Sequence, residues 1–252
     1  MKILSIDTSG QQAGAAIMDE YITIGEILIN AQSGPKTWHH SEILMPAIER
    51  LFTLSGLTLA DMDYVAYTAG PGSFTGLRIG ASTALGLARS INKPAIAVPT
   101  LDALAYNMLG MISASDDITG GESAGLVVPL MDARRGQVYA AIYRAEQSGA
   151  LIRLTDYFAS SIEETLEQIS SLCMTKHPYV TYLGDGADAN KDTIISHHPT
   201  ACFAPPNANR QRPASVTLCA LHQLKTITPQ ENAPIELIYV RDPQAVRAAK
   251  KP

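Results

Sequence analysis

The sequence predicts an α/β protein made of two similar lobes, each a mixed sheet with flanking helices. A short apolar strand at the start ends in Asp7 and a polar turn, and a second strand follows. The same order of strand, aspartate, turn and strand returns after Val127, with Asp132 in the place of Asp7. Segments with helical spacing follow in both halves. These agreements indicate a duplicated domain.

The two lobes are expected at residues 1–100 and 101–252, because a chain of 252 residues holds one large domain or two smaller ones. A helix at residues 214–224 belongs to the second half of the sequence. We expect it to pack back on the first lobe.

The first lobe begins with three apolar runs, which predict an antiparallel meander. They are Ile3–Ile6, Ala13–Met18 and Tyr21–Ile29. A helix is expected at His40–Leu54, where apolar residues recur on one face, and Gly56 ends it. Pro46 falls inside this pattern, so we expect the helix to start near Pro46 or to kink there.

Strands and helices alternate through the rest of the chain. Tyr64–Tyr67 is strand-like, and helical spacing runs from Thr75 to about Ile91. A strand at Pro94–Val98 and a helix from Leu101 follow. The second lobe has strand-like runs and one intervening helix, at Val127–Met131, Gln137–Tyr143, Ser161–Leu172 (the helix) and Pro178–Leu183.

Composition limits what the chain binds and where it works. The net charge of −5 argues against a broad nucleic-acid surface on this chain alone, because such surfaces are usually basic. No run of about 18 apolar residues and no secretory signal are visible, so we expect no membrane segment. The three cysteines lack Cys-x-x-Cys spacing and fit reduced thiols. We therefore expect a cytoplasmic protein.

A glycine-rich loop at Thr68–Gly80 joins a strand to a helix and is shaped to approach either an anion or another backbone closely. It is no Walker loop, since no lysine lies between Ser73 and Ser90. The dinucleotide pattern fails by one residue, because Thr75 stands where the third glycine belongs. A tight turn that binds nothing is an equally good interpretation. The candidate residues of the phosphate-type turns are Asp7, Thr8, Ser9, Gly70, Gly72, Ser73 and Thr75.

Asp7 has two possible roles in this region. It could orient a magnesium-bound water, as a carboxylate does in a kinase-like site. We favour the alternative, in which the carboxylate caps its own turn through the backbone N–H groups of Thr8 or Ser9.

A stripe of small residues follows the loop. Gly76, Gly80, Ala84 and Ala88 recur every four residues and allow another element to approach closely. That element is either the chain's own sheet or a helix of a partner.

These segments together resemble the bacterial TsaB (YeaZ) family, and the strand–aspartate–turn–strand plan resembles the actin and sugar-kinase group (ribonuclease H-like, ASKHA). The resemblance covers most of the chain, and five motifs carry it. They are Ile6–Ser9, His40–Pro46, Ala69–Gly80, Met131–Tyr139 and Tyr239–Arg241.

The resemblance implies a non-catalytic subunit without a catalytic residue, metal or cofactor of its own. It implies pairing with TsaD, the subunit that transfers threonylcarbamoyl to adenosine beside the tRNA anticodon, through the N-terminal lobes of both. TsaE joins that pair, ATP or ADP and the metal belong to the partner subunits, and tRNA is met only through the complex. Alone, such a chain is expected to form a homodimer.

We expect the docking surface on the two helices of the first lobe. The predicted interface residues are His40, Ile43, Leu44, Ala47, Leu51, Gly76, Leu77, Gly80, Ala81, Ala84, Leu85 and Ala88.

Two other functions are weighed against this one. The first is an independent ATP-dependent enzyme of the ASKHA superfamily, which ATP turnover by the purified chain would favour. The second is a metallopeptidase. The sequence argues against it, because no two histidines stand four residues apart as in the metal-binding helix motif of TsaD.

Overall fold

The computed structural model describes residues 1–31, 38–109, 111, 125–146, 150–172 and 179–241. The chain divides into two compact units, one formed by Met1–Ala103 together with the chain from Gln211 onward, and the other by Leu104–Arg210. Residues from Gln211 onward therefore group with the first unit, whereas we assigned them to the second lobe. The last helix packs on the first sheet, as we expected for residues 214–224.

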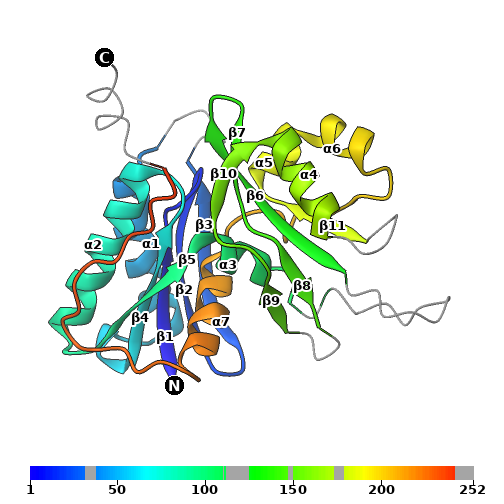
Figure 1. The fold of residues 1–252 in the computed structure, drawn as a ribbon. Coiled ribbons are helices and arrows are strands. Elements are labelled where there is room, and N and C mark those ends of the chain that lie inside the picture. The colour runs from blue at the N-terminus through cyan, green and yellow to red at the C-terminus, as the bar shows by residue number, and fades with distance from the viewer. Residues whose placement is uncertain (32–37, 110, 112–124, 147–149, 173–178, 242–252) are drawn as a thin grey trace, which may run out of the picture. The chain divides into compact units, whose positions relative to one another are not determined.

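The first unit contains a five-stranded mixed sheet in the order β3-β2-β1-β4-β5. β1, β2 and β3 form the predicted antiparallel meander, while β4 and β5 run parallel to β1 (Figure 1). The strands are β1 Lys2–Asp7, β2 Gln12–Asp19, β3 Thr23–Asn30, β4 Tyr64–Gly70 and β5 Ala95–Pro99.

Helices cover both faces of this sheet. On β1, Leu4 and Ile6 join the core beneath α1 and α2, whereas the Ser5 hydroxyl between them donates to Pro213 O of α7 at 2.6 Å. Because alternate residues of a strand point to opposite faces, α7 lies on the face opposite α1 and α2. The helices are α1 His40–Ser55, α2 Phe74–Ser90, α3 Thr100–Tyr106 and α7 Pro213–Gln223, with a 3-10 turn at Leu59–Asp61.

The first helix, α1, runs without interruption through Pro46. We expected the helix to start near Pro46 or to kink there. The first of these alternatives was wrong, because α1 begins at His40. Pro46 lies on the exposed side, where water can satisfy the carbonyl that loses its hydrogen-bond donor. Gly56 ends the helix as predicted, in the left-handed conformation with φ 69°.

The second unit repeats the topology of the first. Its sheet has the order β10-β7-β6-β11-β12, with β8 pairing β6 and β9. β6 pairs β7 antiparallel and β11 parallel, as β1 pairs β2 and β4. The matching order confirms the predicted duplication and fold class. The elements are β6 Leu126–Arg134, β7 Gln137–Ala140, β8 Tyr143–Ala145, β9 Leu151–Arg153, β10 Phe158–Ser161, α4 Ile162–Leu172, β11 Val180–Leu183, α5 Asp185–Ala189, α6 Lys191–His197 and β12 Cys202–Phe203.

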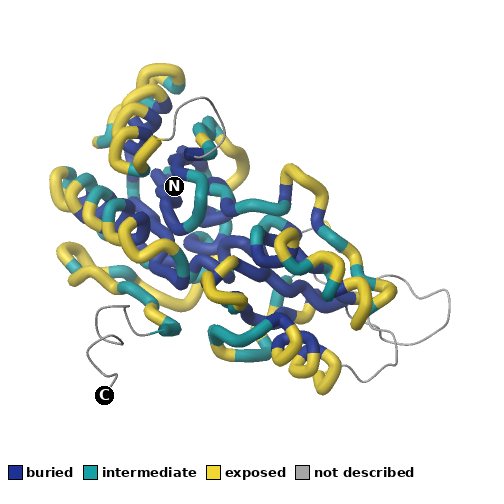
Figure 2. The backbone as a smooth tube through the Cα atoms, turned by 90° about the horizontal axis from the view of Figure 1, so that it is seen from above, coloured by how far each residue is buried: buried dark blue, intermediate teal, exposed yellow. Residues whose placement is uncertain are grey.

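Each unit has its own hydrophobic core. The side of a helix that packs on a sheet is therefore buried. Buried and exposed residues accordingly alternate along the helical turns in Figure 2. Cys202 and Cys219 are free thiols, and Cys173 lies outside the described residues. Among the described helices, none has the length and apolar character needed to cross a membrane.

Candidate functional site

Three segments meet at the glycine-rich loop of the first unit. They are the turn after β1, the connection from β4 to α2, and residue 238 of the C-terminal strap, by which we mean residues 225–241. Ser73 N donates to Ser9 O at 2.7 Å, and Ile238 N donates to Ala69 O at 2.7 Å. The loop is thus bonded on one side to the first turn and on the other to the strap.

Close backbone approach explains the glycines of this motif. Gly70 has φ 113°, and a Cβ there would lie 2.4 Å from Ile238 O. A Cβ on Gly72 would lie 2.5 Å from Ser9 O, and one on Gly76 would lie 2.0 Å from Thr8 O. Of the two predicted alternatives, an anion or another backbone, the structure therefore places another backbone against the loop.

Hydroxyl groups complete this packing. The Thr8 hydroxyl donates to Gly76 O at 2.7 Å, and a Cβ on Gly80 would lie 2.3 Å from the same hydroxyl oxygen. Ser73 is the N-cap of α2, where its Oγ accepts from Gly76 N at 3.2 Å. Thr75 lies exposed on the first turn of that helix. The residues of the predicted phosphate-type turns are therefore brought together, and contacts of Thr8, Ser9, Gly72 and Ser73 join the two turns.

Asp7 caps its own turn, as we favoured. Its Oδ1 accepts from Ser9 N at 2.8 Å and from the Ser9 hydroxyl at 2.7 Å, and the Thr68 hydroxyl adds a bond at 3.3 Å. Complete burial raises the pKa of Asp7 to about 6, against these hydrogen bonds, which lower it. Its Oδ2 has no hydrogen-bond partner among the described residues.

The surroundings of Asp7 fit a metal poorly. In the described part of the chain, no three His, Cys, Asp or Glu side chains gather as metal ligands. Asp7 also offers one oxygen only, since the other is engaged by its turn. His177 lies outside the described residues.

The second unit builds a similar turn from corresponding residues. Gly184 has φ 101°, and a Cβ there would lie 2.0 Å from Leu130 O, which follows the pattern of Gly70. Asp132 N donates to Asp185 Oδ1 at 3.0 Å. Burial raises the pKa of Asp185, with hydrogen bonds and Arg210 acting against it. Here too the glycine serves a close approach of two backbones.

Most residues predicted as a docking interface are core residues of the first unit. His40 is half-buried and its imidazole packs on Gly76; burial, aided by His39, lowers its pKa. The other eleven are buried, and the sheet and the neighbouring helix cover them. They are Ile43, Leu44, Ala47, Leu51, Gly76, Leu77, Gly80, Ala81, Ala84, Leu85 and Ala88.

These eleven residues are buried in the folded unit and do not form its exposed surface. The stripe of small residues packs on the chain's own first turn and sheet, which was the alternative to a partner helix. The outward sides of α1 and α2 are exposed instead, with Met45 48% and Phe74 40% accessible. An interface on these helices would use this outward face.

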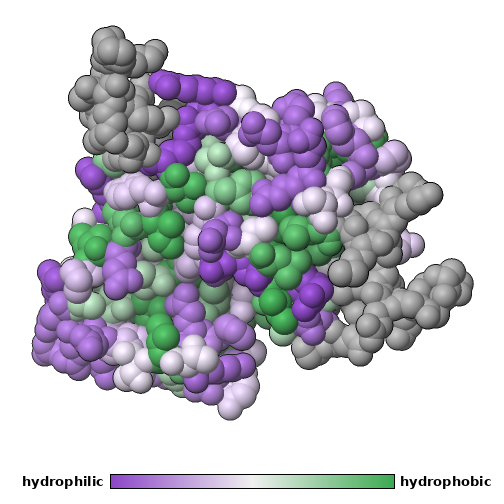
Figure 3. All heavy atoms as spheres, viewed as in Figure 1, coloured by the Kyte–Doolittle hydropathy of each residue, from purple (hydrophilic) through white to green (hydrophobic). Residues whose placement is uncertain are grey.

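The strap packs on the start of α2, a contact that was not predicted although Tyr239–Arg241 is one of the motifs. Tyr239 packs on Phe74 with ring centroids 5.6 Å apart, and the Arg78 guanidinium lies 3.8 Å above the Phe74 ring. Arg78 Nε also donates to the Tyr239 hydroxyl at 3.3 Å. On the face shown in Figure 3, hydrophobic residues gather over α2 and the strap. Only the apolar character of Ile235–Val240 could have signalled this contact.

Comparison with known proteins gives consistent relatives. A family model described as TsaD, tRNA N6-adenosine threonylcarbamoyltransferase, matches residues 35–245. The tRNA threonylcarbamoyladenosine biosynthesis protein TsaB of Bacillus subtilis is 32% identical over 194 residues, which cover 77% of this chain and 75% of that protein. The protein of the same name in Escherichia coli is 33% identical over 149 residues, or 59% of this chain and 58% of that protein.

Solved structures agree at the level of the fold. YeaZ from Pseudomonas aeruginosa superposes with a TM-score of 0.70 at 20% identity and covers 94% of this chain and 99% of its own. A second Pseudomonas aeruginosa structure, described as similar to peptidase YEAZ, has a TM-score of 0.72 at 20% identity, covering 95% and 99%. Together with the sequence matches, these relationships establish that the chain belongs to the TsaB (YeaZ) family, within the group that the TsaD family model describes.

Proposed function

We propose that the chain is a non-catalytic scaffold and activator in the synthesis of N6-threonylcarbamoyladenosine in tRNA. It pairs with TsaD, recruits TsaE and works in the cytoplasm, and it meets tRNA only through the complex. ATP or ADP and the metal belong to the partner subunits. The observation that carries this proposal is family membership, since the Bacillus subtilis and Escherichia coli relatives are named for this biosynthesis.

The chemistry of the glycine-rich loop supports a non-catalytic role. In a nucleotide-handling site, the loop N–H groups face phosphate and a carboxylate faces a metal. Here Ser73 N is bonded to Ser9 O, and the surface of Gly70 is covered by Ile238 O. Asp7 holds its own turn. These groups are engaged within the chain and are not offered to a ligand.

The outward face of α1 and α2 supports a pairing role. It exposes Met45 and Phe74 beside arginines at positions 50, 78 and 89. Large apolar residues and arginine are enriched in protein interfaces, and one self-complementary face gives a two-fold dimer. The equivalent helices of a paralogous subunit fit the same geometry. We therefore expect this face to bind TsaD, and to form a homodimer when TsaD is absent.

Reconstitution with single omissions tests the function. Purified chain, TsaD and TsaE are mixed with the remaining enzymes, ATP, threonine, bicarbonate and unmodified tRNA, and the modified nucleoside is measured. We expect product in the full mixture and a large loss when either this chain or TsaD is left out. The rate of ATP hydrolysis with this chain alone should equal the rate in buffer without protein.

Three outcomes would contradict the proposal. Modified nucleoside formed without TsaD would make this chain the catalyst. ATP turnover by the chain alone, abolished by Asp7→Asn, would favour the independent ATP-dependent enzyme. Full formation of modified nucleoside without this chain would show that the chain is not needed for the modification.

A further inference from the structure

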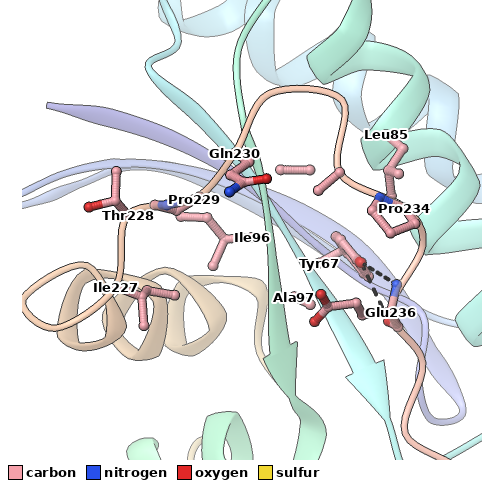
Figure 4. A pocket seen from close by; sticks show the side chains of 12 residues that line it. Tyr67, Leu85, Ile96, Ala97, Ile227, Thr228, Pro229, Gln230, Pro234 and Glu236 are labelled. Carbon is pink, nitrogen blue, oxygen red and sulfur yellow. Dashed lines mark hydrogen bonds between the residues drawn. The ribbon is translucent and has the colours of Figure 1, made fainter.

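A groove of about 330 Å3 lies along β5 in the first unit, between that strand and the strap (Figure 4). Three consecutive strand residues, Ala95, Ile96 and Ala97, line it. Because successive side chains of a strand point to opposite faces, a groove lined by all three follows the edge of the strand. Its other lining residues are Tyr67, Leu85, Ile227, Thr228, Pro229, Gln230, Ala233, Pro234 and Glu236.

The backbone at this edge is available for pairing. β5 is the last strand of its sheet, and Val65 N of β4 donates to Pro94 O at 3.2 Å. In a parallel ladder this register turns the N–H and C=O groups of Ile96 toward β4, and those of Ala95 and Ala97 to the outer side. Within the described residues, no hydrogen bond joins these outer groups to the strap.

The strap is held away from this edge by contacts of its own. The Tyr67 hydroxyl accepts from Glu236 N at 3.2 Å and lies 3.4 Å from Glu236 O, to which it can donate. Ile238 N is bonded to Ala69 O of β4. The strap therefore borders the groove without filling the pairing position on β5.

The groove also has a charge preference. Glu236 is the one charged residue among its twelve lining residues, and Figure 4 shows its side chain pointing toward Ala97. The rest of the lining is mostly small or apolar. Pro94 and Pro99 bracket the strand, so the length available for pairing is short. An extended segment with small or β-branched residues and one basic side chain matches this combination.

We propose that the β5 edge accepts an extended, lysine- or arginine-bearing segment of a partner protein as an added strand. Ala95 and Ala97 supply the backbone hydrogen bonds, and Glu236 pairs with the basic side chain. This site goes beyond the scaffold role proposed above and does not depend on pairing through α1 and α2.

Backbone methylation of a probe peptide tests the added strand. The full chain is titrated against a fluorescent acetyl-Thr-Val-Lys-Val-Thr-amide peptide, and binding is followed by anisotropy. The N–H groups of a strand alternate between its two edges, so methylating both valine nitrogens and methylating the lysine nitrogen block opposite edges. We expect one methylated peptide to lose about tenfold or more in affinity and the other to bind as the parent does.

Variants of the chain identify the edge and the charge. Ala97→Pro removes an outward N–H without touching the bonds to β4, and should weaken the parent peptide about tenfold. Glu236→Gln should weaken the binding of the parent peptide. A peptide with glutamate in place of lysine should bind this variant at least as tightly as it binds the native chain. Unchanged melting temperatures show that both variants remain folded. Glu49→Gln, outside the groove, is the matched control for the lost charge.

Three results would overturn the proposal. One is the absence of saturable binding of the parent peptide. Another is equal binding of both methylated peptides, which would mean that only a side chain enters. The third is unchanged affinity in a folded Ala97→Pro variant.

Discussion

Gly76 and Gly86 lie on the same helix, α2, and meet opposite surroundings. A Cβ on Gly76 would lie 2.0 Å from Thr8 O, whereas a Cβ on Gly86 would meet nothing within 4 Å. We predict that Gly76→Ala lowers the free energy of unfolding by about 2 kcal/mol or more, because backbone would have to move. Gly86→Ala should raise it by up to about 1 kcal/mol through helix propensity. Urea denaturation of the two variants measures both; a neutral Gly76→Ala would contradict the close approach.

The buried carboxyl of Asp7 makes stability depend on pH. Its pKa is raised from 3.8 to about 6, so the folded state holds the proton more tightly than the unfolded state does. The stabilisation is present below pH 3.8 and is lost as pH rises through about 6. A rise of about two pKa units corresponds to roughly 3 kcal/mol.

The Asp7→Asn variant isolates this effect, because the amide does not titrate. Relative to the variant, we predict that the native chain loses about 2–2.5 kcal/mol of unfolding free energy between pH 4 and pH 8. Urea denaturation at both values measures the difference, in which all other titrating groups cancel. A difference that does not change with pH would show that Asp7 is ionised and solvated in the fold.

At the scale of elements, α7 is fixed to the sheet by one acidic side chain. Glu26 on β3 accepts from Ala214 N at 3.0 Å at the start of α7, and from Arg212 Nε at 3.2 Å. Its side chain is 14% accessible. We predict that Glu26→Ala costs about 1–3 kcal/mol of unfolding free energy, because both donors lose their partner. Glu20→Ala, at a surface pair that is 43% accessible on the glutamate side, should cost less than about 1 kcal/mol.

Helix periodicity predicted where α1 and α2 lie, but not what their apolar faces touch. A face that packs on a sheet and a face that binds a partner have the same spacing of apolar residues. Only the three-dimensional placement of Ala84, fully buried against its own unit, decides between them. Pro46 misled for a related reason, since its position on the exposed side of α1 cannot be read from periodicity alone.

This assignment has a direct consequence for substitutions in α2. Ala84→Trp should unfold or strongly destabilise the first unit, because its site is fully buried and overpacking forces the sheet and helix apart. Ser82→Trp, at an exposed position on the same helix, should leave the melting temperature within a few degrees. Thermal unfolding of both proteins compares them. A stable, well-folded Ala84→Trp variant would show that the small-residue stripe is exposed and not packed on the sheet.

At the scale of the whole molecule, the duplication could be predicted because Asp7, at the end of β1, and Asp132, near the end of β6, are each followed by a turn and a second strand. The repeat predicted mixed sheets of similar topology in both units, but not the order of their strands. The return of residues from Gln211 to the first unit could be foreseen only in part, since the bonds of the strap join residues far apart in sequence. Tyr67 and Glu236 carry no local pattern that links them. The strand of the second unit that corresponds to β3 is β10. It was not predicted, because the β8–β9 hairpin precedes it in the sequence.

The central proposal is that product formation depends on pairing through the outward face of α1 and α2. Met45, 48% accessible on that face, and Tyr21, 87% accessible at the β2–β3 turn, are matched exposed hydrophobic residues of one unit. Neither Met45→Asp nor Tyr21→Asp should change the melting temperature, because both side chains are exposed.

The decisive measurement is the rate of modified-nucleoside formation in the reconstituted mixture, recorded beside TsaD binding for both variants. We predict that Met45→Asp weakens TsaD binding at least about tenfold and lowers the rate in parallel, with recovery at high concentration of the variant. Tyr21→Asp should behave as the native chain. A Met45→Asp variant that binds TsaD and supports product formation as the native chain does would contradict the account.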